Sequence, residues 1–278
     1  MINILNQKFF IFFIFLMSLL FLNESIAKTK LKGKVIAGGI VVVEASPNVI
    51  FKLNGNIIPV SKEGYAIIGF ERQPKNLQTL EIIYKDAVTE KISLEVIQRS
   101  YTIQKIDGVE KEKVEPPQEL LDRIYQERSR VKKARRKAGF IQESYYLNGF
   151  IWPAVGIFSG IYGSQRILNG IPKSPHYGLD IALPEGHDVL SPMDGIVLFT
   201  DNDLYYSGGT ILIGHGQGLT TSYLHLSKII VKEGQKILKG GLIGKVGSTG
   251  RATGPHLHWG VEWMGKRLDP EYLVEALR

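Results

Sequence analysis

Two histidines one residue apart, His256 and His258, are the residues of this chain whose types and spacing most directly suggest chemistry. They lie in the segment STGRATGPHLHW. Side chains two positions apart on a β-strand point to the same face, so both imidazoles would lie side by side while Leu257 turns inward. An edge strand with outward polar residues would explain this pair, but imidazole is also the commonest ligand of zinc-like ions. The rest of the chain must distinguish the two interpretations.

All six histidines of the chain lie between His176 and His258. In the segment PHYGLDIALP, His176 and Asp180 are separated by Gly178 and followed by an apolar stretch that is typical of a strand. A loop that bends at the glycine can turn both side chains toward one point. With one histidine of the HLH pair they would form a His, Asp and His set, which suits catalytic zinc and leaves the fourth position to water.

Three segments, HYGLD, SYLHL and GRATGPHLHW, resemble in their order and spacing the lysostaphin-type zinc endopeptidases, which cut peptide crosslinks in the bacterial cell wall. The resemblance covers about Trp152 to Leu273. In that family the histidine and the aspartate of HxxxD bind zinc, together with the second histidine of HxH. The resemblance therefore implies that His176, Asp180 and His258 bind one zinc ion per chain.

The resemblance also implies two catalytic histidines beside the open metal position, His225 of the Tyr-x-His motif and His256. A zinc ion can lower the pKa of its bound water to roughly 7. One histidine would accept the proton of that water and the other would stabilise the oxyanion, and the residues alone do not allocate the two roles. Tyr223 should share the face of His225 and line the cleft, although cross-strand packing would explain it equally well. His215 and His187 are expected to be structural or surface residues.

The function that the resemblance implies is zinc-dependent hydrolysis of the peptide crosslinks of bacterial peptidoglycan, with stem peptides as the substrate. An alternative remains, because some relatives have lost metal ligands and only activate other wall hydrolases by binding. Here all three expected ligands and both flanking histidines are present. A module that only binds the wall would leave the clustered histidines without a role.

The first 27 residues are predicted to be a secretory signal peptide. The apolar run Phe9–Leu22 follows Lys8 and precedes the small residues around Ala27. We therefore expect an exported protein, periplasmic or otherwise associated with the cell envelope, with an uncleaved N-terminal membrane anchor as the alternative. The chain contains no cysteine, so disulfides, a thiol nucleophile and a lipid-anchored lipoprotein are excluded.

The net charge of +7 suits an anionic partner such as cell wall or lipid headgroups. Nucleic acid would fit this charge equally well, but the export signal argues against it and no aromatic-basic binding motif is present. Seven of the ten residues from Arg128 to Lys137 are Lys or Arg. This basic segment could dock on an anionic wall or membrane surface, or it could be a solvated connector helix.

The pattern of apolar residues predicts a mainly β protein with three parts after the leader. Residues 28–110 contain β-branched runs and the turn signal Asn54-Gly55, so we expect a small β-sandwich there. Residues 111–149 read as a charged helical linker, with a helix from Pro117 to about Ala138 whose narrow apolar stripe includes Leu121. Residues 150–278 alternate short apolar runs with glycine-rich turns, which indicates an antiparallel β peptidase domain.

Overall fold

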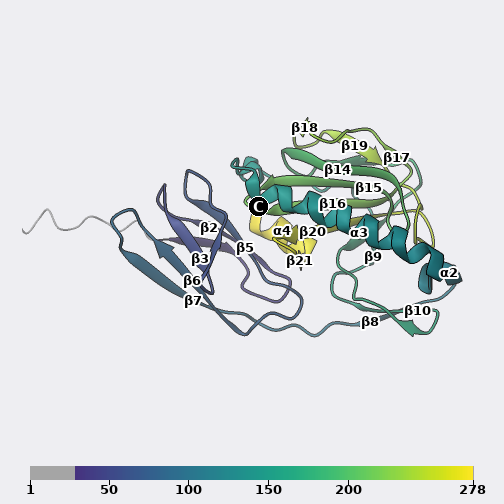
Figure 1. Cartoon of the computed structure of the whole chain (residues 1–278), viewed down its shortest axis with the longest axis horizontal. Helices are drawn as coiled ribbons and strands as arrows, with labels where there is room; N and C mark the ends of the chain where they lie inside the picture. The colour runs from purple at the N-terminus through teal and green to yellow at the C-terminus, as the bar shows by residue number, and fades with distance from the viewer. Residues whose placement is uncertain (1–28, 278) are drawn as a thin grey trace, which may run out of the picture.

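The computed structural model describes residues 29–277, and the fold is mainly antiparallel β-sheet, as predicted (Figure 1). The predicted signal peptide, residues 1–27, lies outside the described residues. Within residues 29–277, none of the helices has both the length and the apolar composition needed to cross a membrane.

The N-terminal region forms two antiparallel sheets that share one apolar core, consistent with the expected small β-sandwich. Phe51 and Leu80 of one sheet are fully buried in that core. Asn54-Gly55 forms the predicted hairpin turn, because both residues have positive φ and Leu53 pairs with Asn56 across them. The first sheet contains β1 (Lys30–Gly33), β2 (Ile40–Glu44) and β5 (Tyr65–Gly69), and the second contains β4 (Asn56–Ile58), β3 (Ile50–Leu53), β6 (Leu77–Ile83) and β7 (Thr89–Glu95).

The C-terminal region is built on an eight-stranded sheet, the largest sheet among the described residues. Its order is β18 (Lys236–Ile237), β14 (Gly195–Leu204), β15 (Gly208–Gly216), β16 (Leu219–Leu226), β20 (His256–Trp263), β12 (Leu179–Ala182) and β9 (Ile157–Gly160), with β21 (Lys266–Leu268) paired to β20. A smaller sheet contains β13 (Asp188–Leu190), β19 (Leu242–Lys245) and β17 (Lys228–Ile229).

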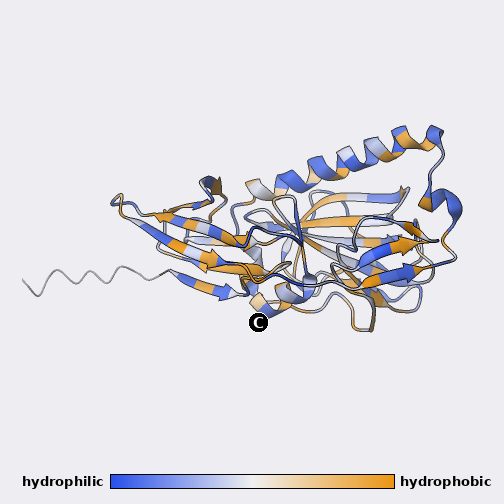
Figure 2. Ribbon diagram, turned by 90° about the horizontal axis from the view of Figure 1, so that it is seen from below, coloured by the Kyte–Doolittle hydropathy of each residue, from blue (hydrophilic) through white to orange (hydrophobic). Residues whose placement is uncertain are grey.

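The two faces of the eight-stranded sheet have different neighbours. Successive residues of a strand point to opposite faces of the sheet. Tyr223 of β16 and Trp259 of β20 pair across the two strands, and both lie in the large apolar core. That core also includes residues of the N-terminal sheets and of α4 (Pro270–Leu277). His258 and Glu262 lie on the other face. The helix α3 (Leu121–Arg136) crosses this second face, where Arg135 forms an ion pair with Glu262 at 3.0 Å (Figure 2).

The predicted helix of the middle segment is present and packs against the sheet. Ile124 and Ala134 are buried, and Val131 is partly buried against the sheet, whereas Leu121 is 38% exposed and does not continue the expected apolar stripe. The segment contains α2 (Lys111–Val114), η2 (Gln118–Leu120), α3, η3 (Lys137–Phe140) and η4 (Tyr145–Asn148).

Strand β8 (Ile103–Ile106) connects the two regions in an unexpected way. It pairs in parallel with β10 (Gln165–Leu168), which in turn pairs with β11 (Ile171–Pro172), so a strand within the range expected for the N-terminal domain completes a sheet of the C-terminal region (Figure 1). The composition of this strand gave no indication of its partner. The domain boundaries near residues 110 and 150 stay a prediction.

Candidate functional site

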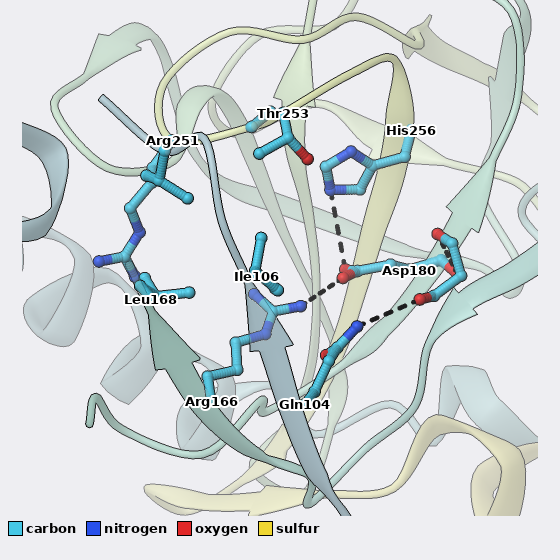
Figure 3. A pocket seen from close by; sticks show the side chains of 11 residues that line it. Gln104, Ile106, Arg166, Leu168, Asp180, Arg251, Thr253 and His256 are labelled. Carbon is cyan, nitrogen blue, oxygen red and sulfur yellow. Dashed lines mark hydrogen bonds and ion pairs between the residues drawn. The ribbon is translucent and has the colours of Figure 1, made fainter. Parts of the chain in front are cut away.

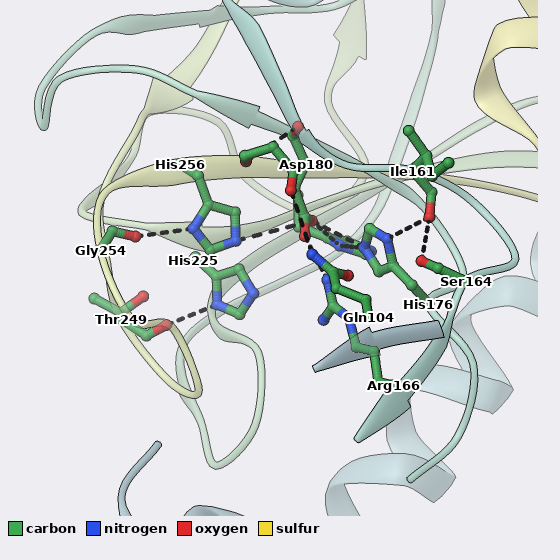
Figure 4. Close-up of polar contacts among 12 residues, drawn as sticks. Gln104, Ile161, Ser164, Arg166, His176, Asp180, His225, Thr249, Gly254 and His256 are labelled. Carbon is green, nitrogen blue, oxygen red and sulfur yellow. Dashed lines mark hydrogen bonds and ion pairs between the residues drawn. The ribbon is translucent and has the colours of Figure 1, made fainter. Parts of the chain in front are cut away.

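The three predicted metal ligands converge on one point. Figure 4 shows two of them, His176 and Asp180, with His225 and His256 nearby. His176 Nε2 lies 2.9 Å from Asp180 Oδ1 and 3.0 Å from His258 Nδ1, and His258 Nδ1 lies 2.7 Å from Asp180 Oδ1. His176 and Asp180 are buried, and the side chain of His258 is 12% exposed. Two imidazoles and a carboxylate therefore present one atom each to a common centre that solvent barely reaches.

The hydrogen bonding of His176 indicates that this centre suits a cation. Its Nδ1 lies 3.0 Å from the carbonyl oxygen of Ile161, which can only accept a hydrogen bond, so Nδ1 carries the proton and Nε2 of the neutral ring presents a lone pair. That lone pair faces a carboxylate oxygen of Asp180 and the Nδ1 of His258. A carbonyl that fixes the tautomer of a histidine in this way is typical of the partner of a metal-ligating imidazole. The donor set fits zinc.

The register of two strands brings these ligands together. In the antiparallel pair of β12 and β20, Asp180 lies opposite His258 and Ala182 lies opposite His256. Gly178 allows this close approach, because a Cβ at that position would lie 2.5 Å from His258 Nε2. The expected role of the glycine between the first two ligands therefore has a specific steric reason.

The two predicted catalytic histidines lie beside this centre. The ring centroid of His225 is 4.8 Å from that of His256 and 6.1 Å from that of His258, and His256 Nε2 is 3.8 Å from Asp180 Oδ1. Each donates its Nδ1 hydrogen to a backbone carbonyl, His225 to Thr249 at 2.8 Å and His256 to Gly254 at 2.9 Å. The Nε2 atom of each neutral ring is therefore free to accept a proton.

Burial shifts the pKa of several of these groups. Burial, together with the nearby His256 and His258, lowers the pKa of His225 to about 3. Burial lowers the pKa of His258 to about 4, against the opposing effect of Asp180. Burial would raise the pKa of Asp180, but hydrogen bonds from His176 and His258 hold it well below its usual range. At neutral pH His225 and His258 are therefore neutral and Asp180 is ionised.

The expectation that Tyr223 shares the face of His225 and lines the cleft is not met. Tyr223 is fully buried in the core behind the sheet, where its hydroxyl lies 2.8 Å from Thr221 Oγ1. The two-residue alternation fails because His225 leaves the β conformation, with a φ of 65°. Cross-strand packing against Trp259, the other interpretation of Tyr223, agrees with its position.

His215 and His187 lie apart from the three convergent ligands. His215 is fully buried, with Nδ1 2.7 Å from the carbonyl oxygen of Asp194 and Nε2 2.7 Å from Thr221 Oγ1. Burial lowers the pKa of His215 to about 4. His187 is exposed, and its Nδ1 lies 2.9 Å from the carbonyl oxygen of Asp188. The structural and surface roles expected for these two residues fit these positions.

Two side chains at the site were missed by reasoning from the sequence. Arg166 Nη2 donates to Asp180 Oδ2 at 2.5 Å, and Gln104 of β8 lines the adjoining pocket together with His256 (Figure 3). Neither residue belongs to a histidine motif. Their proximity depends on the parallel pairing of β8 with β10, for which the sequence carries no signal.

The N-terminal region also supports the loop that surrounds His176. Arg72 Nε donates to the carbonyl oxygen of Gly163 at 2.7 Å, and its guanidinium lies 4.3 Å from the ring centroid of Tyr101. The amide of Gly163 donates to the carbonyl oxygen of His176 at 2.7 Å, in the same loop whose Ile161 carbonyl fixes the tautomer of His176. A chain of contacts thus runs from the N-terminal region to a predicted metal ligand.

Comparison with known proteins finds similarity that includes the whole of this site. Residues 174–270 match peptidase family M23. The peptidoglycan DD-endopeptidase ShyA of Vibrio cholerae is 51% identical over 96 residues, which are 34% of this chain and 22% of that protein. The DD-carboxypeptidase/endopeptidase Mpg of Neisseria meningitidis serogroup B is 41% identical over 95 residues, again 34% of this chain and 22% of that protein.

A solved structure extends the similarity beyond the site. A crystal structure of a Pseudomonas aeruginosa protein described as a peptidase M23 aligns with a TM-score of 0.65 and 30% identity, and the alignment covers 87% of this chain and 96% of that chain. The similarity therefore includes the N-terminal region as well as the sheet that carries the histidines. From the matched motifs, the site geometry and this likeness over nearly the full length of a solved relative, we conclude that the chain belongs to peptidase family M23, the lysostaphin-type peptidases.

Proposed function

We propose that this chain is a zinc-dependent endopeptidase that hydrolyses peptide crosslinks of bacterial peptidoglycan. The observation that carries the proposal is the convergence of His176 Nε2, Asp180 Oδ1 and His258 Nδ1, with the rings of His225 and His256 beside them. The name of the relative ShyA supports peptidoglycan as the substrate, and the names of ShyA and Mpg both support a bond of the DD type as the bond that is cut. Because the chain matches only 22% of the length of each, this activity is a proposal for the whole protein.

In this proposal the residues of the site have distinct roles. His176, Asp180 and His258 hold one zinc ion per chain, and that ion supplies Lewis acidity and lowers the pKa of water. Asp180 keeps its charge because Arg166 and the two histidines stabilise the ionised form. His225 and His256 share proton transfer and oxyanion stabilisation between them, since the Nδ1 hydrogen of each is held by a carbonyl and its Nε2 is available.

The alternative function, a silent wall-binding protein that activates other hydrolases, requires a site that cannot hold metal or move protons. The geometry favours hydrolysis, because all three ligand atoms lie within 4.8 Å of one another. Both flanking histidines also keep their hydrogen-bonded orientation.

The proposed location is the cell envelope, where the substrate is found. The names of two relatives, a peptidoglycan DD-endopeptidase and a lipoprotein NlpD/LppB homolog of Pseudomonas aeruginosa that is 33% identical over 128 residues, are consistent with this location. The stem peptides of peptidoglycan are the proposed partners in binding, and no nucleic acid is proposed.

Digestion of purified peptidoglycan, followed by mass analysis of the fragments, tests the proposal. The zinc-loaded protein should release fragments cut within the crosslinks, and removal of zinc with a chelator should stop the release. Readdition of zinc should restore it. A zinc-loaded, folded protein that binds peptidoglycan without cutting it would instead support the activator function.

A further inference from the structure

A pocket of about 170 Å³ adjoins the predicted metal centre and extends away from it between β8, β10 and the loop before β20. Asp180 and His256 form its wall toward the centre. Arg251 lies on the side of the pocket away from these two residues, as Figure 3 shows, and Arg166 also lines it. The pocket is therefore a continuation of the site and is open to whatever occupies the centre.

The lining of this pocket carries more positive than negative charge. It contains two guanidinium groups, Arg166 and Arg251, and a single carboxylate, Asp180. That carboxylate already pairs with Arg166 and faces the predicted ligands. Within residues 29–277, Arg251 forms no ion pair with a carboxylate. Burial lowers the pKa of Arg251, and the nearby positive charges of Arg166 and Arg128 act in the same direction.

Several hydrogen-bonding groups in the pocket are also unpartnered. The side chain of Arg251 makes one long hydrogen bond, from Nη1 to the carbonyl oxygen of Lys113 at 3.3 Å, and stacks 4.6 Å from the ring centroid of Tyr206. A guanidinium has five N–H donors, so most of those of Arg251 remain available. Among the described residues, Arg166 Nε and Gln104 Oε1 are buried without a hydrogen-bond partner. A partly buried cation and a buried donor without a hydrogen-bond partner both lower the stability of the folded protein. An anionic acceptor that binds them offsets this loss.

We propose that this pocket binds a free carboxylate of the substrate peptide and that Arg251 is the residue that recognises it. The inference rests on the proposed function, because it identifies the substrate group that lies beside the reacting bond. A carboxylate presents two oxygens to the fork of a guanidinium, and such charge-assisted pairs are the stronger hydrogen bonds of proteins. Gln104 lines the same pocket.

The chemistry of a DD bond agrees with this assignment. In a DD crosslink the nitrogen is attached to the α-carbon of a D-configured centre, and that carbon also bears a carboxyl group. The last bond of a stem peptide that ends in D-Ala-D-Ala has the same arrangement, with a free carboxylate. A substrate held at the metal centre would therefore carry its negative charge close to the reacting bond, where the pocket begins. Arg251 would then contribute to the choice of substrate, whereas His225 and His256 act on the bond itself.

Calorimetry with two peptides tests the proposal. The probes are a synthetic stem pentapeptide that ends in D-Ala-D-Ala with a free carboxylate and the same peptide as its C-terminal carboxamide. Binding is measured with the zinc-loaded full chain in a His225→Ala background, so that the peptide is not consumed. Arg251→Gln removes the proposed contact, and Arg251→Lys keeps the charge but loses the fork. The matched control is Arg128→Gln, which removes a nearby guanidinium that does not line the pocket.

We expect the background protein to bind the free carboxylate about 10–100 times more tightly than the carboxamide, the ratio given by a charge-assisted hydrogen bond. Arg251→Gln should bring that ratio close to one without weakening carboxamide binding. Arg251→Lys should give an intermediate ratio, and Arg128→Gln should keep the full ratio. Equal binding of both peptides by the background protein, or an equal loss for both peptides in Arg251→Gln, overturns the proposal.

The test of the carboxylate pocket and the test of peptidoglycan hydrolysis can fail independently of each other. If the wild-type protein digests peptidoglycan but its background variant binds both peptides equally, only the carboxylate pocket is wrong. If the preference depends on Arg251 while the wild-type protein cuts no crosslink, the pocket assignment stands and the proposed hydrolysis is wrong. Thermal unfolding and zinc content of each variant establish that a loss of binding does not result from misfolding.

Discussion

The two regions of this molecule contribute to the site in different ways. The C-terminal region provides all five residues of the predicted centre, and the sequence predicts them from their motifs and from the family that these motifs resemble. The N-terminal region contains no histidine, yet it supports the loop around His176 through Arg72. The connecting strand β8 forms a wall of the pocket through Gln104.

This difference shows that the side chains which perform chemistry and those which position them carry different signals in a sequence. Ligands must be of particular residue types, so they form recognisable patterns. A residue that positions a ligand can be of many types, because it needs only to donate a hydrogen bond to a carbonyl group near that ligand. Such contacts depend on which segments pair in the tertiary structure. Variants that remove a residue of the predicted centre can be compared with variants that remove only a positioning contact. Their relative effects on zinc binding and activity test this difference between the two regions.

The largest effect is expected from loss of a predicted ligand. His176→Ala should remove most of the zinc, because coordination by the two remaining residues is much weaker, and activity should fall by more than the 10–100-fold typical of lost outer partners. Elemental analysis and peptidoglycan digestion measure both quantities. His187→Ala, which alters an exposed histidine, is the control and should retain zinc and activity. A wild-type zinc content in His176→Ala would rule out this ligand assignment.

Substitution of either predicted catalytic histidine should lower activity without lowering the zinc content. His225→Ala and His256→Ala should keep the zinc and fold normally, since neither is among the three convergent ligands. Activity should fall about 10²–10⁴-fold, because proton transfer is lost. Zinc content measured beside the rate of crosslink cleavage checks this division. Loss of metal from either variant would show that the division between ligands and proton carriers is wrong.

The support from the N-terminal region should give a smaller but measurable effect. Arg72→Gln removes the hydrogen bond to the Gly163 carbonyl and the stacking on Tyr101. We expect it to lower the free energy of unfolding by about 1.5–3 kcal/mol, the contribution of a charged hydrogen bond, and to weaken zinc binding up to roughly tenfold. Urea unfolding and a competitive zinc titration measure the two effects.

The control for Arg72 removes another cation of the same region. Lys91→Gln breaks an exposed ion pair with Glu81 and should change stability by less than about 1 kcal/mol without changing zinc affinity. If Arg72→Gln behaves in the same way as Lys91→Gln, the two regions are energetically independent.

The pH dependence of stability should also be located in the C-terminal region. The folded-state pKa of His215 is about 4 and the ordinary value is 6.5, so the unfolded chain gains a proton before the folded chain does. The stabilisation is therefore complete above pH 6.5 and is lost as the pH falls toward about 4. The loss is at most roughly 3 kcal/mol for this residue. His215→Gln should reduce the slope of unfolding free energy against pH in this window, and an unchanged slope would contradict the assignment.

The smallest effect is expected from the basic segment. Arg130 and Arg135 already form ion pairs with Asp201 and Glu262 of the sheet, so fewer positive charges are free than the sequence suggests. Replacing the exposed Lys132 and Lys133 with Gln should weaken binding to intact sacculi only a few-fold at low ionic strength and scarcely at 0.15 M salt. Cleavage of a soluble peptide should not change. A loss that is independent of salt would exclude an electrostatic docking role.

Much of the fold and of the centre could be predicted because local rules determine them. The shared face of His256 and His258 follows from the two-residue period of a strand, and the hairpin at Asn54-Gly55 follows from positive φ. Other features depend on contacts between segments distant in sequence. Arg166 was missed because an arginine has many possible partners, and only the tertiary structure brings it to Asp180.

The position of Tyr223 has a local cause that the sequence does not display. Alternation along β16 holds as far as Leu224, whose neighbour across the sheet is His258. His225 then adopts a φ of 65°, and its amide donates to the carbonyl oxygen of Ser207. A non-glycine residue with positive φ is uncommon, so the alternation of side chains along a strand usually predicts which face a residue shares. Here the alternation fails at His225, the residue expected to act on the substrate.

The short ladder between β8 and β10 has a consequence for the motions of the molecule. It contains four residue pairs, none of the residues of β8 is buried, and Ile103 is 65% exposed, whereas every residue of β15 is buried. Segments with few buried contacts open at a lower free energy than the global unfolding of the domain. Amide hydrogens of β8 should therefore exchange with solvent earlier than those of β15. Strand β8, which forms one wall of the pocket, can therefore open locally while the strands that carry the histidines stay folded. The two sides of the site then unfold in separate cooperative units.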